Sequence, residues 1–310
     1  MRKIPILFTF DDNLLMPAGV CITSLLLNAN PDTFYDIFIL HSAQYDFSRT
    51  DLMKLPEVFP NCRITLRKVA GEFVGAYEVR GIPETAYYRL IAPELIPEYD
   101  KLLYSDVDVI FREDLTRFYE LDLKDNYLAA VDNCSALRPG VQKYVEKELQ
   151  LDWRKGYFYS GNLVIHSALM RQDGITDKFR ALRHKQYLQQ DMDIMNIVCN
   201  GRILNLGPEY CLSNYLYDLI VNRRQEMLRF YSNEQLDRAL KTGIVHYNGA
   251  KPWKQACMNL DIWWECYRKS IFFDEQFAFD FWDAQTHLLA KLTLSKRFKL
   301  LGRKILKMDR

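Results

Sequence analysis

The hydrophobic pattern of the first seventy residues predicts alternating strands and helices. Apolar runs at residues 4–10 and 35–40, and alternation at 64–69, are typical of strands. Residues 18–28 have helical spacing, and residues 48–55 are predicted as a second helix. Because strands separated by helix-length segments require parallel crossovers, the chain is predicted to have an α/β fold.

The pattern continues through the middle of the chain. Further elements are expected in this order: a helix at 85–95, strands at 101–111 and 127–131, an apolar segment at 156–166, helices at 176–184 and 190–199, and a strand at 202–206. Ligands bind beyond the carboxyl ends of strands in open α/β sheets. Residues 11–13, Asp106 and Asp108 each follow a predicted strand, so we expect them at one edge of the sheet.

Composition narrows the class of protein. The 310 residues are 49% hydrophobic, enough for one large domain or two small ones. The 41 basic and 40 acidic residues are nearly balanced, so no overall field attracts nucleic acid. Seven scattered cysteines without CxxC spacing favour reduced thiols in a cytosolic setting over disulfides or a zinc site.

The sequence also predicts how the protein relates to a membrane. Residues 1–12 carry a short apolar run that leads into acidic residues, which predicts a buried first strand rather than a signal peptide. No run reaches the ~18 apolar residues of a spanning helix, so a soluble or peripheral protein is expected. Residues 288–310 are basic, with Leu and Ile at roughly helical spacing, which favours a helix at an anionic membrane surface. The alternative is a solvated terminal helix.

The apolar segment at 101–111 carries two aspartates in its second half. In a strand, Asp106 and Asp108 point to the same face, and two carboxylates that meet there suit Mn²⁺ or Mg²⁺. The spacing alone is not specific, since Asp-x-Asp is expected about once by chance in such a chain. Asp191 and Asp193 indeed form a second example. The alternative interpretation is a solvated acidic turn.

The segment at 242–253, TGIVHYNGAKPW, adds further candidate ligands. His246 offers an imidazole as a third metal ligand, Gly249 allows the backbone to approach a phosphate, and Lys251 offers a positive charge. A lone histidine is usually structural, but the grouping of these three residues favours a site. Arg89 is either exposed or paired inside a site, and the sequence by itself favours exposure.

Six motifs, in this order, resemble those of the retaining glycosyltransferases of family 8: FTFDDN at 8–13, YYRL at 87–90, YSDVDVIF at 104–111, YFYSGNLVI at 157–165, QDMDIMN at 190–196 and HYNGAKPW at 246–253. The resemblance is greatest to the bacterial branch that adds galactose or glucose to lipopolysaccharide. It implies a GT-A fold at 1–265, with a Rossmann-like domain around a central mixed sheet, and a helical C-terminal extension at 266–310. It also implies a hexosyltransferase that uses UDP-glucose or UDP-galactose.

The resemblance assigns a role to each matching residue. The implied ligands of Mn²⁺, or of Mg²⁺ in its place, are Asp106, Asp108 and His246. The implied donor-binding residues are Thr9, Asp11, Asn13, Arg89, Asp106, Val107, Ser160, Gly161, Gly249 and Lys251. The implied catalytic residues are Asp191 and Arg89 beside the transferred sugar and Asp132 facing the acceptor. A glycan or lipid-linked acceptor and a cytoplasmic location, peripheral at the inner face of the plasma membrane, follow from the same resemblance and the basic tail.

The chain departs from the family pattern in several places. Met192 stands where relatives often carry glutamine, which excludes a covalent intermediate on that side chain. Retention through Asp191 as nucleophile or through front-face attack by the acceptor stays open, and we favour front-face attack. Tyr159 replaces an asparagine, Leu14 replaces a stacking tyrosine, and the spacing from His246 to Lys251 is one residue shorter than usual.

Two other functions compete with this interpretation. The departures raise the alternative of a catalytically inactive protein that binds nucleotide sugars. A different nucleotide-utilising enzyme of the Rossmann type is disfavoured, because no GxGxxG or GxxxxGK[ST] motif follows a predicted strand.

Overall fold

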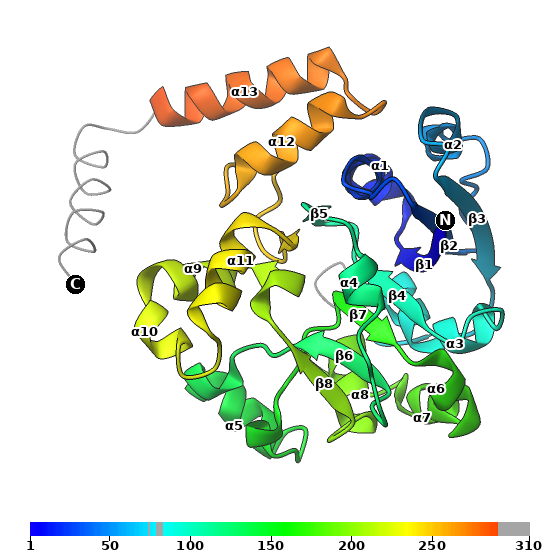
Figure 1. The fold of residues 1–310 in the computed structure, drawn as a ribbon, viewed down its shortest axis with the longest axis vertical. Helices are drawn as coiled ribbons and strands as arrows, with labels where there is room; N and C mark the ends of the chain where they lie inside the picture. The colour runs from blue at the N-terminus through cyan, green and yellow to red at the C-terminus, as the bar shows by residue number, and fades with distance from the viewer. Residues whose placement is uncertain (74, 79–82, 291–310) are drawn as a thin grey trace.

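A seven-stranded mixed sheet forms the centre of the protein. The structure is a computed structural model in which residues 1–73, 75–78 and 83–290 are described (Figure 1). The strand order is β3-β2-β1-β4-β7-β6-β8. Neighbours are parallel except where β7 pairs with β4 and β6. The strands are β1 (Arg2–Thr9), β2 (Thr33–Ser42), β3 (Cys62–Val69), β4 (Leu102–Ser105), β6 (Leu128–Val131), β7 (Asn162–Ile165) and β8 (Ile203–Leu206). The prediction of an α/β fold with a mixed sheet is therefore confirmed.

Helices cover both faces of this sheet. Alternate residues of β1 face opposite cores, with Ile6 and Phe8 on the side of α1 and Leu7 on the side of α6, α7 and α8. The first half of the chain contributes η1 (Asp12–Leu14), α1 (Leu15–Leu27), η2 (Asp51–Lys54), α2 (Leu55–Val58), η3 (Glu84–Ile91), α3 (Ala92–Leu95), α4 (Thr116–Tyr119), η4 (Ser135–Leu137) and α5 (Pro139–Lys147). The second half contributes η5 (Trp153–Lys155), α6 (Ser167–Gln172), α7 (Ile175–Leu182), α8 (Asp191–Val198), η6 (Pro208–Tyr210), α9 (Asn214–Asn222), α10 (Arg224–Met227) and α11 (Asn233–Lys241).

A second, three-stranded sheet corrects one prediction. The segment at 101–111 is not a single strand, because the chain leaves the central sheet after Ser105 and enters β5 (Val109–Phe111). This strand pairs antiparallel with β10 (Ile244–His246), which also pairs with β9 (Leu212–Ser213). Asp106 and Asp108 therefore lie in the link between two sheets rather than on one face of a strand.

Two aromatic-rich helices complete the described chain. In α12 (Leu260–Lys269), Trp263, Trp264 and Tyr267 are buried in the same core as α1. The predicted division at residue 265 lies within this helix. Figure 1 shows α13 (Glu275–Ala290) beside α12 at one end of the molecule. No helix of the described ranges is long and apolar enough to span a membrane. The tail predicted to bind membranes, 288–310, lies mostly beyond the described residues, and all seven cysteines are free.

Candidate active site

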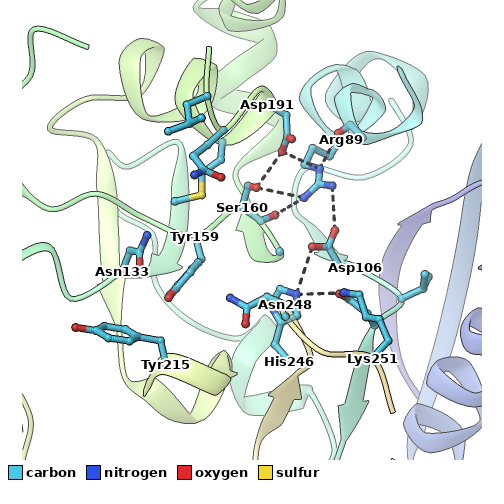
Figure 2. A pocket seen from close by; sticks show the side chains of 18 of the residues that line it. Arg89, Asp106, Asn133, Tyr159, Ser160, Asp191, Tyr215, His246, Asn248 and Lys251 are labelled. Atoms are coloured by element: carbon cyan, nitrogen blue, oxygen red, sulfur yellow. Dashed lines mark hydrogen bonds and ion pairs between the residues drawn. The ribbon is translucent and has the colours of Figure 1, made fainter. Parts of the chain in front are cut away.

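A cavity of ≈ 1320 Å³ opens where β1 and β4 end. The carboxyl ends of these parallel neighbours meet there, since Phe8 pairs with Ser105. Residues predicted for the site that line this cavity are Thr9, Asp11, Asn13, Arg89, Asp106, Val107, Asp108, Ser160, Gly161, Asp191, His246, Gly249 and Lys251. Segments more than a hundred residues apart in the sequence thus contribute to one cavity, as Figure 2 shows for several of them.

Two carboxylates and an imidazole converge on one side of the cavity. Ligand atoms of Asp106, Asp108 and His246 all lie within 4.8 Å of one another. Nε2 of His246 is 3.2 Å from Oδ1 of Asp108 and 3.6 Å from Oδ2 of Asp106. The pairing of β10 with β5 sets His246 opposite Val109, which brings the imidazole beside the acidic link. This donor set suits Mn²⁺ or Mg²⁺.

Gly161 leaves the space in which these three side chains meet. A Cβ atom at this position would lie 2.3 Å from Cε1 of His246 and 2.7 Å from Oδ2 of Asp106. The Gly161 carbonyl also accepts a hydrogen bond of 2.7 Å from the main-chain N–H of Asp106. The residues present therefore fit a metal ion, because a glycine gives the carboxylate and the imidazole room beside each other.

Ion pairs keep the carboxylate of Asp108 in its charged form. Its carboxylate contacts His246 and accepts a hydrogen bond from Nζ of Lys251, which also donates to the Tyr247 carbonyl at 2.7 Å. Burial raises the pKa of Asp108, but the charges of His246 and Lys251 outweigh it and hold the pKa well below its usual range. Asp108 is thus ionised and ready to bind a cation.

His246 has a second partner that the sequence did not indicate. Its Nδ1 lies 3.3 Å from Sγ of the buried Cys211. Burial lowers the pKa of His246, yet the carboxylate of Asp108 and then Cys211 raise it well above its usual value. A partner at Nδ1 fixes the ring so that Nε2 faces the two aspartates.

Arg89 links the metal-binding group to the second acidic motif. The side chain is 7% exposed, so the expectation of an exposed arginine is wrong. Its Nη2 lies 2.9 Å from Oδ1 of Asp106, and its Nε lies 3.3 Å from Oδ2 of Asp191. Its Nη1 donates to the Ser160 carbonyl at 2.8 Å. Burial is possible because two carboxylates compensate the guanidinium charge.

Asp191 lies at the first position of α8, where the helix dipole favours a negative charge. Ser160 Oγ donates to its Oδ2 at 2.9 Å. Burial raises the pKa of Asp191, and Arg89 offsets part of this effect. In Figure 2 Asp191, Ser160 and Arg89 form one connected group beside Asp106.

The end of β1 provides a separate polar group in the same cavity. Thr9 Oγ1 is 3.3 Å from the Tyr104 hydroxyl, and Asn13 Nδ2 donates to Asp11 Oδ2 at 3.4 Å. Oδ1 of Asp11 is buried and meets no hydrogen-bond partner among the described residues. A buried acceptor of this kind is suited to an N–H or O–H group of a ligand.

Comparison with known proteins places this arrangement in a family. The sequence profile of Glycosyl transferase family 8 matches residues 5–257. The chain belongs to glycosyl transferase family 8. It is 28% identical over 249 residues to the lipopolysaccharide 1,2-glucosyltransferase of Escherichia coli strain K12, covering 78% of this chain and 70% of that protein.

Solved structures show the same fold. The galactosyltransferase LgtC in complex with donor and acceptor sugar analogues has a TM-score of 0.70 at 24% identity, covering 89% of this chain and 99% of that one. The bifunctional glycosyltransferase WbbM has a TM-score of 0.73 at 24% identity, and the match covers 92% of this chain but only 52% of WbbM. The predictions of the GT-A fold and of an enzyme, a hexosyltransferase, are confirmed.

Asp132 is the one predicted site residue of this family-8 enzyme that does not line the cavity. Its Oδ1 accepts from the main-chain N–H of Ser135 at 3.1 Å, and its Oδ2 accepts from that of Tyr157 at 2.8 Å. Burial raises the pKa of this carboxyl group. Asp132 thus holds the loop that follows β6, and its predicted role toward the acceptor stays a prediction.

Other residues that line the cavity of this family-8 enzyme were not predicted from the sequence. Prominent among these residues are Asn133, Arg138, Tyr144, Tyr157, Gln189, Tyr215, Asn248 and Lys254. Asn133 follows β6 and could have been found from the rule that ligands bind beyond strand ends. Arg138 and Tyr215 lie at the starts of α5 and α9, two helices that no sequence pattern placed near the cavity. The three substituted positions of the family motifs, Leu14, Tyr159 and Met192, all line the cavity as well.

Proposed function

We propose that this enzyme transfers glucose or galactose from a UDP-sugar to lipopolysaccharide or another cell-surface glycan, with retention of the anomeric configuration and dependence on Mn²⁺. The observation that carries the proposal is the convergence of Asp106, Asp108 and His246 beside Arg89 and Asp191 in one cavity. Support for the two sugars comes from the names of the relatives, a glucosyltransferase and a galactosyltransferase.

The metal site would stabilise the nucleotide as it leaves. Asp106, Asp108 and His246 would hold Mn²⁺, or Mg²⁺ in its place, and a bound cation supplies positive charge to the diphosphate of the leaving UDP. Lys251 would shift its hydrogen bonds from Asp108 toward a phosphate oxygen, and Gly249 would let the backbone approach that phosphate. Thr9, Asp11 and Asn13 would hold the uridine at the end of β1.

The transferred sugar would lie against Arg89, Ser160, Gly161 and Asp191. The carboxylate of Asp191 would stabilise the positive charge that develops on the sugar ring when the anomeric bond breaks. Met192 lines the cavity but has no nucleophilic oxygen, so it forms no covalent intermediate. Two routes to retention stay open, a covalent intermediate on Asp191 and front-face attack by the acceptor hydroxyl, and we favour front-face attack.

A screen of donors tests this function. Purified protein with Mn²⁺ is incubated with UDP-glucose, UDP-galactose and UDP-N-acetylglucosamine, and release of UDP is measured. We expect UDP release from the glucose or galactose donor that disappears on chelation of the metal. Tight binding of UDP without turnover of any donor would support an inactive nucleotide-sugar-binding protein instead.

We also propose a cytoplasmic location with peripheral binding to an anionic membrane surface through the tail at 288–310. The support is the basic composition of the tail, since residues 291–310 lie outside the described residues. Deletion of 288–310 should release the protein from vesicles that contain phosphatidylglycerol and leave UDP binding unchanged. Persistent vesicle binding by the truncated protein would show that the tail is not the anchor.

A further inference from the structure

We propose that the acceptor of this enzyme carries an anionic substituent, a phosphate or a carboxylate, and that Arg138 binds it. The inference rests on the proposed function, because it assigns the far side of the donor cavity to the acceptor. Its basis is a cavity-lining guanidinium that is held in place on an aromatic ring without a carboxylate partner among the described residues.

The position of Arg138 is defined by two contacts. The guanidinium lies over the ring of Tyr215, 4.4 Å from its centroid, and Nη1 donates to Oδ1 of Asn133. In Figure 2, Asn133 and Tyr215 lie across the cavity from Lys251, with Tyr159 between them and the group of Ser160 and Asp191. Arg138 is thus on the side of the transferred sugar that faces away from the nucleotide, where an acceptor has to bind.

Arg138 differs in its charge partners from Arg89 and Lys251, two other cationic residues that line the cavity. Arg89 pairs with Asp106 and Asp191, and Lys251 pairs with Asp108. Arg138 forms no ion pair with any carboxylate in the part of the chain that the structure describes, and its guanidinium donates there to Oδ1 of Asn133. A guanidinium has five N–H donors in a planar fork, so this side chain retains donors for a phosphate or carboxylate.

The loop that carries Arg138 is built to hold this position. Arg138 caps α5, and Gln142 in that helix donates to the Ser135 carbonyl at 3.0 Å. Asp132 fixes the start of the same loop through the main-chain N–H groups of Ser135 and Tyr157. A guanidinium fixed before the ligand arrives loses less freedom on binding, which is the arrangement expected for recognition of an anion.

The neighbouring side chains complete a surface for a sugar. Tyr215 and Tyr159 line the cavity with aromatic rings, and Asn133 adds an amide. The Tyr159 hydroxyl, 3.3 Å from Ser213 Oγ, anchors that ring. Flat apolar faces beside hydrogen-bonding groups suit a sugar ring, and Arg138 adds selectivity for one that bears a negative charge. Lys254 also lines the cavity, but it follows Lys251 in the segment assigned to the donor phosphates.

Binding of small probes tests the inference. The protein is saturated with UDP and Mn²⁺, so that the donor phosphate subsite is filled, and titrated calorimetrically with glucose, glucose 6-phosphate and glucuronic acid at one ionic strength. We expect an anionic probe to bind roughly tenfold or more tightly than glucose. If glucose 6-phosphate binds more tightly than glucuronic acid, the substituent is a phosphate, and the reverse order indicates a carboxylate. Equal binding of all three probes would overturn the inference.

Variants separate Arg138 from general charge effects. Arg138→Gln should reduce binding of the anionic probe to the level of glucose, and Arg138→Lys should retain part of the preference. The matched control is Arg229→Gln, which removes an exposed arginine stacked on Phe230 outside the cavity and should keep the preference. A preference that survives Arg138→Gln but is lost in Lys254→Gln would contradict the assignment.

Hydrolysis of the donor separates this inference from the proposed function. Slow release of UDP from the active UDP-sugar by water needs no acceptor, so the wild-type protein and the control Arg229→Gln should hydrolyse the donor at rates within about twofold of each other. Failure of the wild-type protein to hydrolyse any UDP-sugar counts against the proposed function. Normal hydrolysis together with no discrimination between glucose and the anionic probes counts against the inference about Arg138 alone.

Discussion

Gly161 and His246 are so close that a methyl group on the glycine would lie 2.3 Å from Cε1 of the imidazole. Gly161 belongs to the stretch at the start of β7, and His246 ends β10 in the second sheet. The contact joins the two sheets at the point where Asp106 and Asp108 link them. The geometry of the metal-binding group therefore depends on a residue that offers no ligand atom.

Substitution of this glycine should disrupt the group. In Gly161→Ala the added Cβ displaces the imidazole or the Asp106 carboxylate, and we expect Mn²⁺ affinity to fall about 10- to 100-fold. Electron paramagnetic resonance of free Mn²⁺ measures this directly. Gly140→Ala is the matched control, since a Cβ there meets nothing within 4 Å and metal binding should not change. Unchanged affinity in Gly161→Ala would refute the steric argument.

Cys211 should influence metal binding through His246. In Cys211→Val the Nδ1 atom loses the Sγ partner at 3.3 Å, so the ring is free to turn and Mn²⁺ affinity should fall about tenfold. Cys211→Ser keeps a hydrogen-bonding atom and should restore most of the affinity. Cys199→Val, at an equally buried cysteine in the other core, should leave affinity unchanged. Equal affinity in all three variants would show that the contact has no role.

Arg89 should matter for both stability and turnover. Arg89→Met leaves Asp191 and Asp106 without their shared guanidinium, and breaking a buried pair of this kind costs about 3–5 kcal/mol. Turnover should fall at least about hundredfold, as for loss of a group that orders the transition state. Chemical denaturation and UDP release measure the two effects.

An exposed pair provides the control for Arg89. Arg2→Met breaks the pair with Glu120, whose side chains are 43% and 54% exposed, and should change the free energy of unfolding by less than about 1 kcal/mol. If Arg89→Met is no more destabilising than Arg2→Met, the compensation assigned to Arg89 is wrong.

Asp36 in β2, far from the cavity, should make the stability of the protein depend on pH. Its buried carboxylate accepts from Nε of Arg63 at 2.9 Å, from Nη2 at 2.6 Å and from the Tyr99 hydroxyl at 2.5 Å. Burial raises the pKa of Asp36, but the hydrogen bonds of Arg63 and Tyr99 lower it below its usual value. The stabilisation is therefore present above the unfolded-state pKa near 3.8 and is lost as pH falls through the lower folded-state pKa.

Removal of the Asp36 carboxylate tests the predicted direction of this pH dependence. Asp36→Asn should lower the free energy of unfolding at pH 7 by about 2 kcal/mol and flatten its decline below pH 4. Asp51→Asn is the control, because its pair with Lys54 is exposed and should contribute less than about 1 kcal/mol. Identical acid profiles for wild type and Asp36→Asn would contradict the pKa argument.

Part of the cavity lining could be predicted from the sequence because some of its residues follow strands. Asp11 follows β1 and Asp106 follows β4, which are parallel neighbours, so the rule that ligands bind beyond strand ends brings these two together. His246 ends β10 in the other sheet, and the family resemblance, not this rule, predicted that it joins them. The route of the chain was not predictable. An apolar run with two central aspartates resembles one strand, whereas pairing with β10 divides it between two sheets.

The part of the cavity that we propose for the acceptor could not be predicted in the same way. Arg138 at the start of α5 meets Tyr215 at the start of α9, and this tertiary contact is not indicated by any local pattern. The residue pattern by itself favoured an exposed Arg89, because most arginines are exposed, and only the family resemblance placed it in the site. The two carboxylates that compensate it lie 17 and 102 positions further along the chain (89 to 106 and 89 to 191).

The most direct test of the proposed chemistry is Mn²⁺-dependent release of UDP from the active UDP-sugar by wild type and Asp108→Asn. This substitution keeps the size of the side chain and removes the charge that His246 and Lys251 face. We predict that Asp108→Asn stays folded, binds UDP without any response to Mn²⁺ and releases no UDP from the sugar donor. Wild-type turnover in Asp108→Asn would contradict a metal site at Asp106, Asp108 and His246.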